Sequence, residues 1–140
     1  MAGPVYLRAE ERLDGPRVES ALDLTPLFGT WYNSDYGESG GIHRIELSER
    51  DGTLRVQVFA AGATHPHDWG EATAFAYAES VSDRSAWAFN VKYDLGFVEV
   101  LLSAYTKMFA RTGVLAVTSY NTFHDDSGRA NYWTREFYHR

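Results

Sequence analysis

The stretch that decides the fold is "ERDGTLRVQVFA", residues 49–60. After the turn pair Asp51-Gly52, apolar side chains occupy every second position, at Leu54, Val56, Val58 and Ala60. A period of two places alternate side chains on opposite faces of a strand. An Asp-Gly pair next to such a pattern is a strong hairpin signal. These residues therefore predict an antiparallel hairpin with one apolar face.

Similar stretches recur along most of the chain, and turn residues separate them. We expect eight strands, near residues 29–35, 41–49, 53–61, 69–79, 84–93, 97–105, 113–122 and 131–138. Eight short strands without a long helical pattern predict an all-β fold, an eight-stranded antiparallel up-and-down barrel. The interior of such a barrel can hold one small ligand. An immunoglobulin-like sandwich is the alternative, but its crossovers need longer connections than this sequence has.

The 140 residues suit a single domain. Residues 1–24 are charged, contain Pro and Gly, and read as an N-terminal arm, whereas residues 25–140 form the barrel. A short helical turn is expected at the junction, with Thr25 as its N-cap and Pro26 at its first position.

Composition excludes several classes of function. The net charge is −6 and the 13 basic residues are scattered, which argues against a nucleic-acid partner. The absence of cysteine excludes disulfides and thiolate metal sites. No apolar run is long enough to span a bilayer and no basic, apolar leader is present, so we expect a cytoplasmic protein without a membrane partner. No nucleotide-binding fingerprint occurs, and no cofactor is expected.

The stretch "FGTWYNSD", residues 28–35, carries a family resemblance. Its Gly29-x-Trp31 resembles the G-x-W signature of the lipocalin and calycin barrels. The resemblance implies that Trp31 closes the floor of the barrel and that an arginine late in the chain packs across it. Arg135 is the expected partner, through a cation–π contact. Typical lipocalins are secreted and disulfide-bonded, so the closer analogy is to intracellular calycin-type or small bacterial barrels. The segments "GTWYNSD", "HPHDWGE" and "DDSGRANYW" are also similar to an uncharacterised bacterial family, a likeness that implies no chemistry.

The inner face of the barrel is chosen from the strand near 69–79. Its alanines alternate with Phe75 and Tyr77. An exposed aromatic face would leave a large apolar patch in water. We therefore expect the aromatics inside and the alanines outside, where the N-terminal arm or a second subunit of a homodimer would lie. The predicted ligand-binding residues are Trp31, Phe75, Tyr77, Trp87, Phe89, Tyr93, Tyr105 and Trp133. Simple core packing is the alternative for Trp31, Phe89 and Phe97.

Three side chains are the candidates for catalysis. Glu99 shares a strand face with Phe97 and Leu101. If that face is internal, desolvation raises the carboxyl pKa and suits Glu99 to acid–base work, and an outward glutamate is the alternative. His43 shares a face with Ile45 and Leu47 and is either a hydrogen-bonded core residue or a base. Tyr120 is the third predicted working group, and Glu136 is expected on the surface beside Arg135.

The histidine-rich stretch "GATHPHDWGE", residues 62–71, precedes or enters the fourth expected strand. In an eight-stranded meander this connection lies at the same end as the one that holds His124, Asp125 and Asp126. A zinc or iron site needs at least three converging ligands. We expect no metal and regard a solvated loop as the default, and we leave open whether the two loops meet over a pocket.

Three functions fit these observations. The first is binding of a small, largely apolar molecule in an aromatic-lined cavity. The second is a cyclase or isomerase that acts on a biosynthetic intermediate in the same cavity, mainly by orienting it. The third is a packed structural or dimerisation domain. The sequence names neither the ligand nor the oligomeric state.

Overall fold

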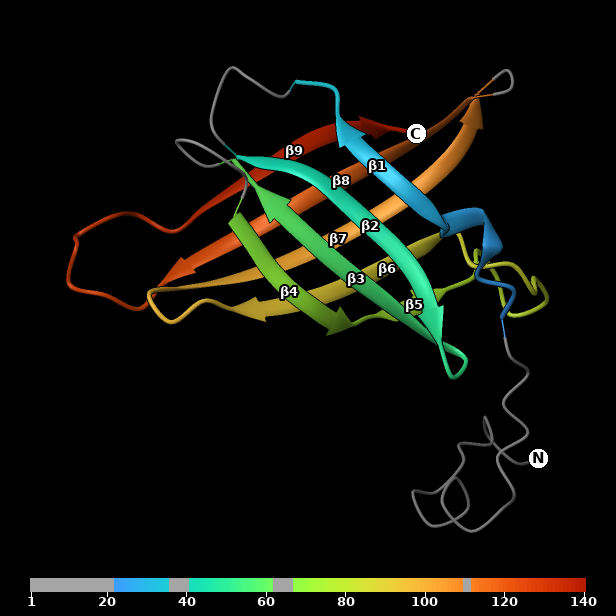
Figure 1. Cartoon of the computed structure of the whole chain (residues 1–140), viewed down its shortest axis with the longest axis horizontal. Coiled ribbons are helices and arrows are strands. Elements are labelled where there is room, and N and C mark those ends of the chain that lie inside the picture. Colours follow the sequence, from blue (N-terminus) through green and yellow to red (C-terminus); the bar gives the residue numbers. More distant parts are fainter. Residues whose placement is uncertain (1–21, 36–40, 62–66, 110–111) are drawn as a thin grey trace, which may run out of the picture.

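The computed structural model describes residues 22–35, 41–61, 67–109 and 112–140. In this part of the chain, nine antiparallel strands form one sheet that curls into a nearly closed barrel (Figure 1), with neighbours in the order β4-β3-β2-β1-β9-β8-β7-β6-β5. The elements are η1 (Thr25–Leu27), β1 (Gly29–Asn33), β2 (Ile42–Arg50), β3 (Thr53–Ala60), β4 (His67–Thr73), β5 (Phe75–Tyr77), β6 (Ala88–Asp94), β7 (Val98–Phe109), β8 (Thr112–Phe123) and β9 (Tyr132–His139). The prediction of an all-β antiparallel barrel is confirmed, with nine strands in place of eight. None of the described residues belongs to a helix long and apolar enough to cross a bilayer.

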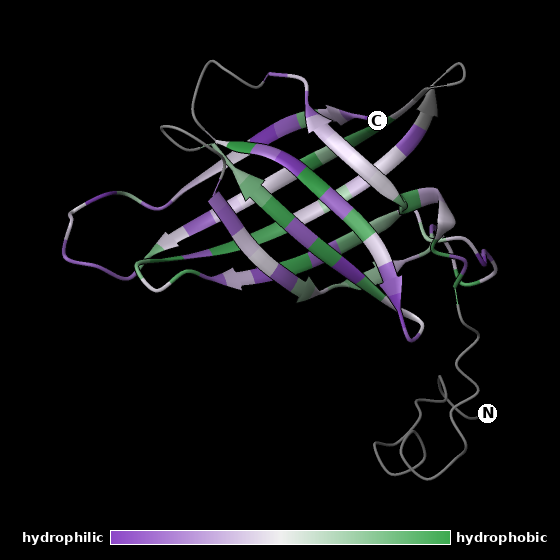
Figure 2. Ribbon diagram, viewed as in Figure 1, coloured by the Kyte–Doolittle hydropathy of each residue, from purple (hydrophilic) through white to green (hydrophobic). Residues whose placement is uncertain are grey.

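The hairpin formed by β2 and β3 has the expected geometry. Asp51 and Gly52 both have positive φ angles, 54° and 78°, as a two-residue hairpin turn requires. The inner face of the hairpin includes two buried pairs, Leu47 with Val56 and Ile45 with Val58. Hydrophobic and hydrophilic positions alternate along both strands in Figure 2. The period of two therefore decides which side chains of this hairpin enter the core.

The fourth expected strand, residues 69–79, is divided into β4 and β5 at Ala74. β4 pairs with β3, and β5 pairs with β6. Between them the backbone N–H of Ala74 donates a hydrogen bond to the carbonyl of Leu54 on β3, at 2.9 Å. Within the described ranges no ladder joins β4 to β6. We call the line between β4 and β6 the seam of the barrel.

Tyr93 on β6 bridges this seam. Its hydroxyl oxygen lies 2.9 Å from the carbonyl oxygens of Val56 on β3 and Gly70 on β4. Its ring packs edge-on against Trp69, with the ring centroids 5.5 Å apart. Burial raises the pKa of Tyr93 above its usual value, because the charged phenolate is disfavoured away from water. The hydroxyl therefore stays protonated as a donor where a backbone ladder is missing.

The end of the barrel beside η1 is closed by Trp31. Its side chain is fully buried and donates from Nε1 to the carbonyl of Leu27 at 2.9 Å. The guanidinium of Arg140 lies 4.1 Å from the Trp31 ring centroid and donates a hydrogen bond to the carbonyl of Phe28 at 2.9 Å. The expected pairing of Trp31 with Arg135 is therefore wrong. The side chain of Arg135 points outward from β9, whereas Arg140 comes directly after the last residue of β9, at the closed end of the barrel.

Gly29 is required at this closed end for two reasons. Its φ of +125° is a conformation that side-chain-bearing residues rarely adopt. A Cβ atom at this position would also lie 3.2 Å from Cδ of Arg140. The helical turn before it starts after Leu24, and Thr25 does not cap it. Instead the hydroxyl of Thr25 donates to the carboxylate of Asp23 at 2.7 Å.

The inner face chosen for residues 69–79 is wrong. Ala74 is buried and Ala76 packs against the core, while Phe75 and Tyr77 point outward and are 69% and 47% exposed. These small side chains pack into the same core cluster as the large side chains of Leu54 and Phe89. The alanine-rich face is thus unavailable as a dimer interface. On β6 the expected phase is confirmed, because Phe89, Val91 and Tyr93 are all buried.

Candidate functional site

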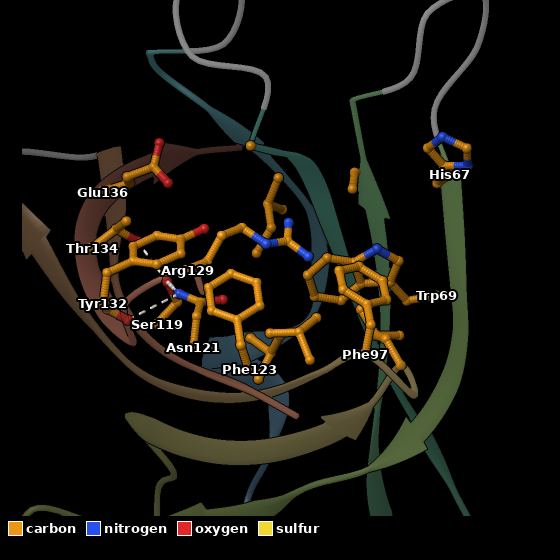
Figure 3. A pocket seen from close by; sticks show the side chains of 16 residues that line it. His67, Trp69, Phe97, Ser119, Asn121, Phe123, Arg129, Tyr132, Thr134 and Glu136 are labelled. Carbon is orange, nitrogen blue, oxygen red and sulfur yellow. Dashed lines mark hydrogen bonds between the residues drawn. The ribbon is translucent and has the colours of Figure 1, made fainter. Parts of the chain in front are cut away.

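A pocket of about 520 Å³ opens at the end of the barrel opposite η1. It lies where β2, β4, β7 and β9 begin and where β3, β6 and β8 end. We call this end the mouth. Below it, the buried side chains of Trp31, Phe89 and Leu115 fill the barrel. The pocket is therefore the upper part of the barrel interior, between a packed core and the mouth (Figure 3).

One side of the pocket, which we call the apolar wall, is hydrophobic. It consists of Ile42, Ala60, Trp69, Leu95, Phe97, Val98, Val100 and Phe123. Ile42, Val98 and Val100 are buried, and Trp69, Leu95 and Phe123 pack against the core. This wall is fixed by the ends of five strands and by the turn between β6 and β7. It offers a largely preformed surface to the apolar part of a ligand.

The other side, the polar wall, is formed by Ser119, Asn121, Thr134 and Glu136. The hydroxyls of Ser119 on β8 and Thr134 on β9 lie 2.6 Å apart, and Nδ2 of Asn121 donates to the Ser119 oxygen at 3.1 Å. Antiparallel pairing places Ser119 opposite Thr134. The pleat therefore directs this row of polar side chains into the pocket from two neighbouring strands (Figure 3).

Glu136 is the carboxylate of this pocket. Its Oε2 accepts a hydrogen bond from Nδ2 of the buried Asn33 at 2.8 Å, and the same amide donates to the carbonyl of Ile42. Burial and, next, the charge of Glu136 raise the pKa of Tyr138 above its usual value. Glu136 is thus held from behind by Asn33 and faces the pocket. Its expected place on the surface is wrong, because Arg135 and not Glu136 has the outward phase of β9.

Arg129 reaches across the mouth from the loop between β8 and β9 (Figure 3). Its guanidinium lies 4.3 Å from the ring centroid of Phe123 and 5.4 Å from that of Phe97. Its Nη2 donates to Oδ2 of Asp125 at 2.8 Å, and hydrogen bonds from Ser127 and Arg129 lower the pKa of Asp125. The charge of Arg129 is therefore balanced by its own loop, and its flat face covers part of the mouth.

The structure places none of the eight predicted ligand-binding residues in the lining of this pocket. Trp31, Phe89 and Tyr93 are inside the barrel but belong to the packed core. Trp87 is half-buried before β6, where its Nε1 donates to Asp83 at 3.1 Å. The inward orientation expected for the remaining four is wrong, since these side chains are exposed on the outer surface: Phe75, Tyr77, Tyr105 and Trp133.

The three predicted catalytic residues also lie outside the pocket lining. Glu99 takes the outward alternative, with Oε1 2.6 Å from Nζ of Lys92 and Oε2 3.2 Å from Nε2 of His124. The hydrogen bond from Lys92 and then the one from His124 lower the pKa of Glu99, opposite to the raised pKa considered for catalysis. His43 lies in a β-bulge between Ile42 and Arg44 and packs edge-on against Tyr32, with ring centroids 6.3 Å apart. Tyr120 is half exposed.

The two polar loops at the mouth are partly within the described residues. His65 lies outside them, whereas His67 and Arg129 both line the pocket. Asp68 bonds its own turn, since its Oδ1 accepts from the backbone N–H of Gly70 at 2.8 Å. Among the residues that the structure describes, no group of three or more His, Asp or Glu side chains is arranged to hold a metal ion.

Sequence reasoning missed the polar wall because it assigned Tyr120 to the interior. Tyr120 stands between Ser119 and Asn121 on β8, and Trp133 and Phe137 flank the segment from Thr134 to Glu136 on β9. Four polar residues in phase on neighbouring strands were the available signal. No protein-family model, no curated protein and no solved structure matches this chain significantly.

Proposed function

We propose that the barrel binds a small amphipathic molecule that has an apolar body and a neutral head group that donates hydrogen bonds. The observation that carries this proposal is the division of the pocket into an apolar wall and a polar wall. Its volume of about 520 Å³ lies in the usual range for small-molecule sites. The apolar body would lie against Ile42, Val98 and Val100, and the head group would face Glu136.

The charge and the hydrogen-bond acceptors of the polar wall determine which head group suits the pocket. The carboxylate of Glu136 accepts hydrogen bonds and cannot donate when ionised. The Arg129 guanidinium at the mouth is already paired with Asp125 at 2.8 Å, so it adds little net attraction for an anion. An alcohol or an amide N–H therefore suits the pocket better than a carboxylate, which would face Glu136 with the same charge.

A cyclase or isomerase in the same pocket is the second candidate, and Glu136 is the observation that favours it. A carboxylate held by Asn33 beside the Ser119 and Thr134 hydroxyls has the components needed to move a proton at a bound substrate. In this version Glu136 takes the role that the sequence suggested for Glu99. The remainder of the rate enhancement would come from holding the substrate in one conformation.

We also propose a distant relation to the calycin barrels. It is supported by the nearly closed antiparallel barrel, by Gly29 and Trp31 at the head of β1, and by the arginine stacked on Trp31. That arginine is Arg140 and not the expected Arg135. The relation concerns the fold and adds no ligand of its own.

The binding proposal is tested with two matched probes, 1-dodecanol and dodecanoate, titrated against the protein by calorimetry at neutral pH. We expect 1-dodecanol to bind more tightly, because its hydroxyl can donate to Glu136. The Glu136→Gln variant keeps an acceptor oxygen but loses the charge. It should weaken 1-dodecanol binding by about five- to tenfold, because hydrogen bonds to charged groups contribute about 1.5–3 kcal/mol and those to neutral groups about 0.5–1.5 kcal/mol. The matched control, Glu99→Gln on the outer surface, should leave binding unchanged.

Two results would overturn the proposal. Equal loss of binding in Glu136→Gln and Glu99→Gln would show that the polar wall does not hold the head group. Unchanged binding in Val100→Trp, which places a large ring in the pocket, would place the ligand elsewhere. For the enzyme alternative, native mass spectrometry of protein from its own source identifies the retained molecule. Incubation of that molecule with purified protein must then yield an isomer of unchanged mass, and Glu136→Gln must abolish it.

A further inference from the structure

We propose that the outer face of β7, β8 and β9 is the interface of a homodimer. Nine outward-facing residues form a grid of three rows across these strands: Leu101, Tyr120 and Trp133; Ser103, Thr118 and Arg135; Tyr105, Ala116 and Phe137. The ladders place each row in register, because Tyr120 pairs with both Leu101 and Trp133, and Ala116 pairs with both Tyr105 and Phe137. We call these nine residues the outer grid. The three strands lie side by side as one wall of the barrel in Figure 1.

The outer grid is unusually apolar for an exposed sheet face. Five of its large side chains are 40–65% exposed, namely Leu101, Tyr105, Tyr120, Trp133 and Phe137. Among these nine described residues Arg135 is the one charged side chain, and its Nη2 donates to the Tyr105 hydroxyl at 2.7 Å. The chain as a whole carries a net charge of −6, which opposes association. The outer grid contains no carboxylate, so it adds no negative charge to that repulsion.

The area of the outer grid agrees with a dimer. A large aromatic side chain has about 200 Å² of surface, so the four aromatic side chains of the outer grid, each about half exposed, present about 400 Å², to which Leu101 adds. This lies within the range of about 300–600 Å² for the largest apolar patch on a monomer, and such a patch often has a function. The polar row lies between the two apolar rows and adds its own exposed surface. The total area of the face then comes closer to the ~800 Å² that each partner buries in a stable interface.

A second copy fits this face because the grid is complementary to itself. Consider a two-fold axis that lies between the two facing sheets and runs parallel to β8. It places Trp133 of one protomer over Leu101 of the other, and Phe137 over Tyr105. Every apolar corner then meets an apolar corner, and Arg135 meets Ser103 rather than another arginine. Two sheets packed in this way lie about 10 Å apart. Closed two-fold contacts of this type are the commonest in homo-oligomers.

The test is the mass of the full chain in solution by sedimentation velocity. We expect wild-type protein at micromolar concentration to sediment at twice its 15.8 kDa chain mass. Trp133→Arg should weaken the dimer by at least about tenfold, because buried aromatics at an interface carry much of its affinity. Phe75→Arg is the matched control, since Phe75 is 69% exposed on β5, outside the outer grid. The control should remain dimeric.

A thiol introduced at the grid centre gives a second measurement that does not depend on Trp133. The chain has no cysteine, so Thr118→Cys supplies one thiol close to the two-fold axis. A short bis-maleimide reagent should link two such chains covalently, whereas Asn90→Cys on β6 should stay unlinked. Monomeric wild-type protein would overturn the proposal. Dissociation by Phe75→Arg, or linkage of Asn90→Cys in preference to Thr118→Cys, would also overturn it.

Discussion

Replacement of Tyr93 by Phe removes the hydroxyl that joins β6 to β3 and β4 across the seam. The ring itself is 6% exposed and stays in the core, so the change leaves packing intact and the carbonyls of Val56 and Gly70 lose a donor. Loss of a buried hydrogen bond of this kind costs about 1.5 kcal/mol of unfolding free energy. For a domain of this size that corresponds to a melting temperature about 4 °C lower.

The same variant should change how stability depends on alkaline pH. Burial raises the pKa of Tyr93, so the folded protein keeps a proton that the unfolded chain releases above about pH 10. The stability from this group is complete below that pH and is lost as the pH rises further. Allowing for some solvent at the seam, we expect the wild type to lose about 1 kcal/mol through Tyr93 by about pH 11. The Phe variant lacks this loss.

Urea denaturation followed by tryptophan fluorescence measures both effects, because Trp69 contacts Tyr93 directly. The difference between wild type and Tyr93→Phe should fall from about 1.5 kcal/mol at neutral pH to about 0.5 kcal/mol near pH 11. Tyr32→Phe, at a half-exposed position on β1, is the control and should lie within about 0.5 kcal/mol of wild type throughout. A difference that stays constant between neutral pH and pH 11 would refute the role of the buried hydroxyl.

Three other predictions concern the closed end and the outer surface. Arg140→Ala should lower the unfolding free energy by about 1–2 kcal/mol in urea denaturation, because it removes the stacked guanidinium and its bonds to two carbonyls. Gly29→Ala should lower it by about 1–3 kcal/mol owing to the positive φ, whereas Gly41→Ala, without such a φ, should be nearly neutral in a thermal melt. Glu99→Gln should reduce the loss of unfolding free energy at acid pH, measured as stability against pH. The pKa of Glu99 is lowered by Lys92, so the contribution of this carboxylate is present above about pH 4 and lost as the pH falls.

The sequence predicts the backbone pattern well because the period of two is a local property. Seven of the eight expected strands lie within a few residues of an observed one, and the turn at Asp51 and Gly52 has the predicted form. The exception is the segment 69–79, which Ala74 divides. The division depends on which strands pair with each part of the segment, and alternation within the segment does not indicate those strands.

The pocket was harder to predict because alternation defines two faces without saying which one is inside. The expected interior depends on the assumption that aromatic residues avoid water, and for β8 and β9 this assumption selects the wrong face. Tyr120 and Trp133 are half exposed or more, while Ser119 and Glu136 face the pocket. An exposed aromatic row is expected where a sheet face binds a partner. The proposed dimer would therefore explain why Tyr120 and Trp133 lie outside and not, as expected, inside. At the closed end the arginine was misplaced because the stacking partner of Trp31 follows the last strand.

The seam has a consequence for how this barrel could respond to a guest. In a barrel whose neighbouring strands are all joined by backbone hydrogen bonds, strand number and stagger fix the diameter. Widening such a barrel would break a continuous row of these hydrogen bonds. Here β4 and β6 are joined across the described seam by the Tyr93 hydroxyl, close to the Trp69 side of the pocket. We therefore expect sub-global opening at this place to cost less than elsewhere, and amide protons of β4 to exchange faster than those of β7 and β8. The barrel thus has a preferred place to spread, and molecules of different width could be admitted without unfolding the core.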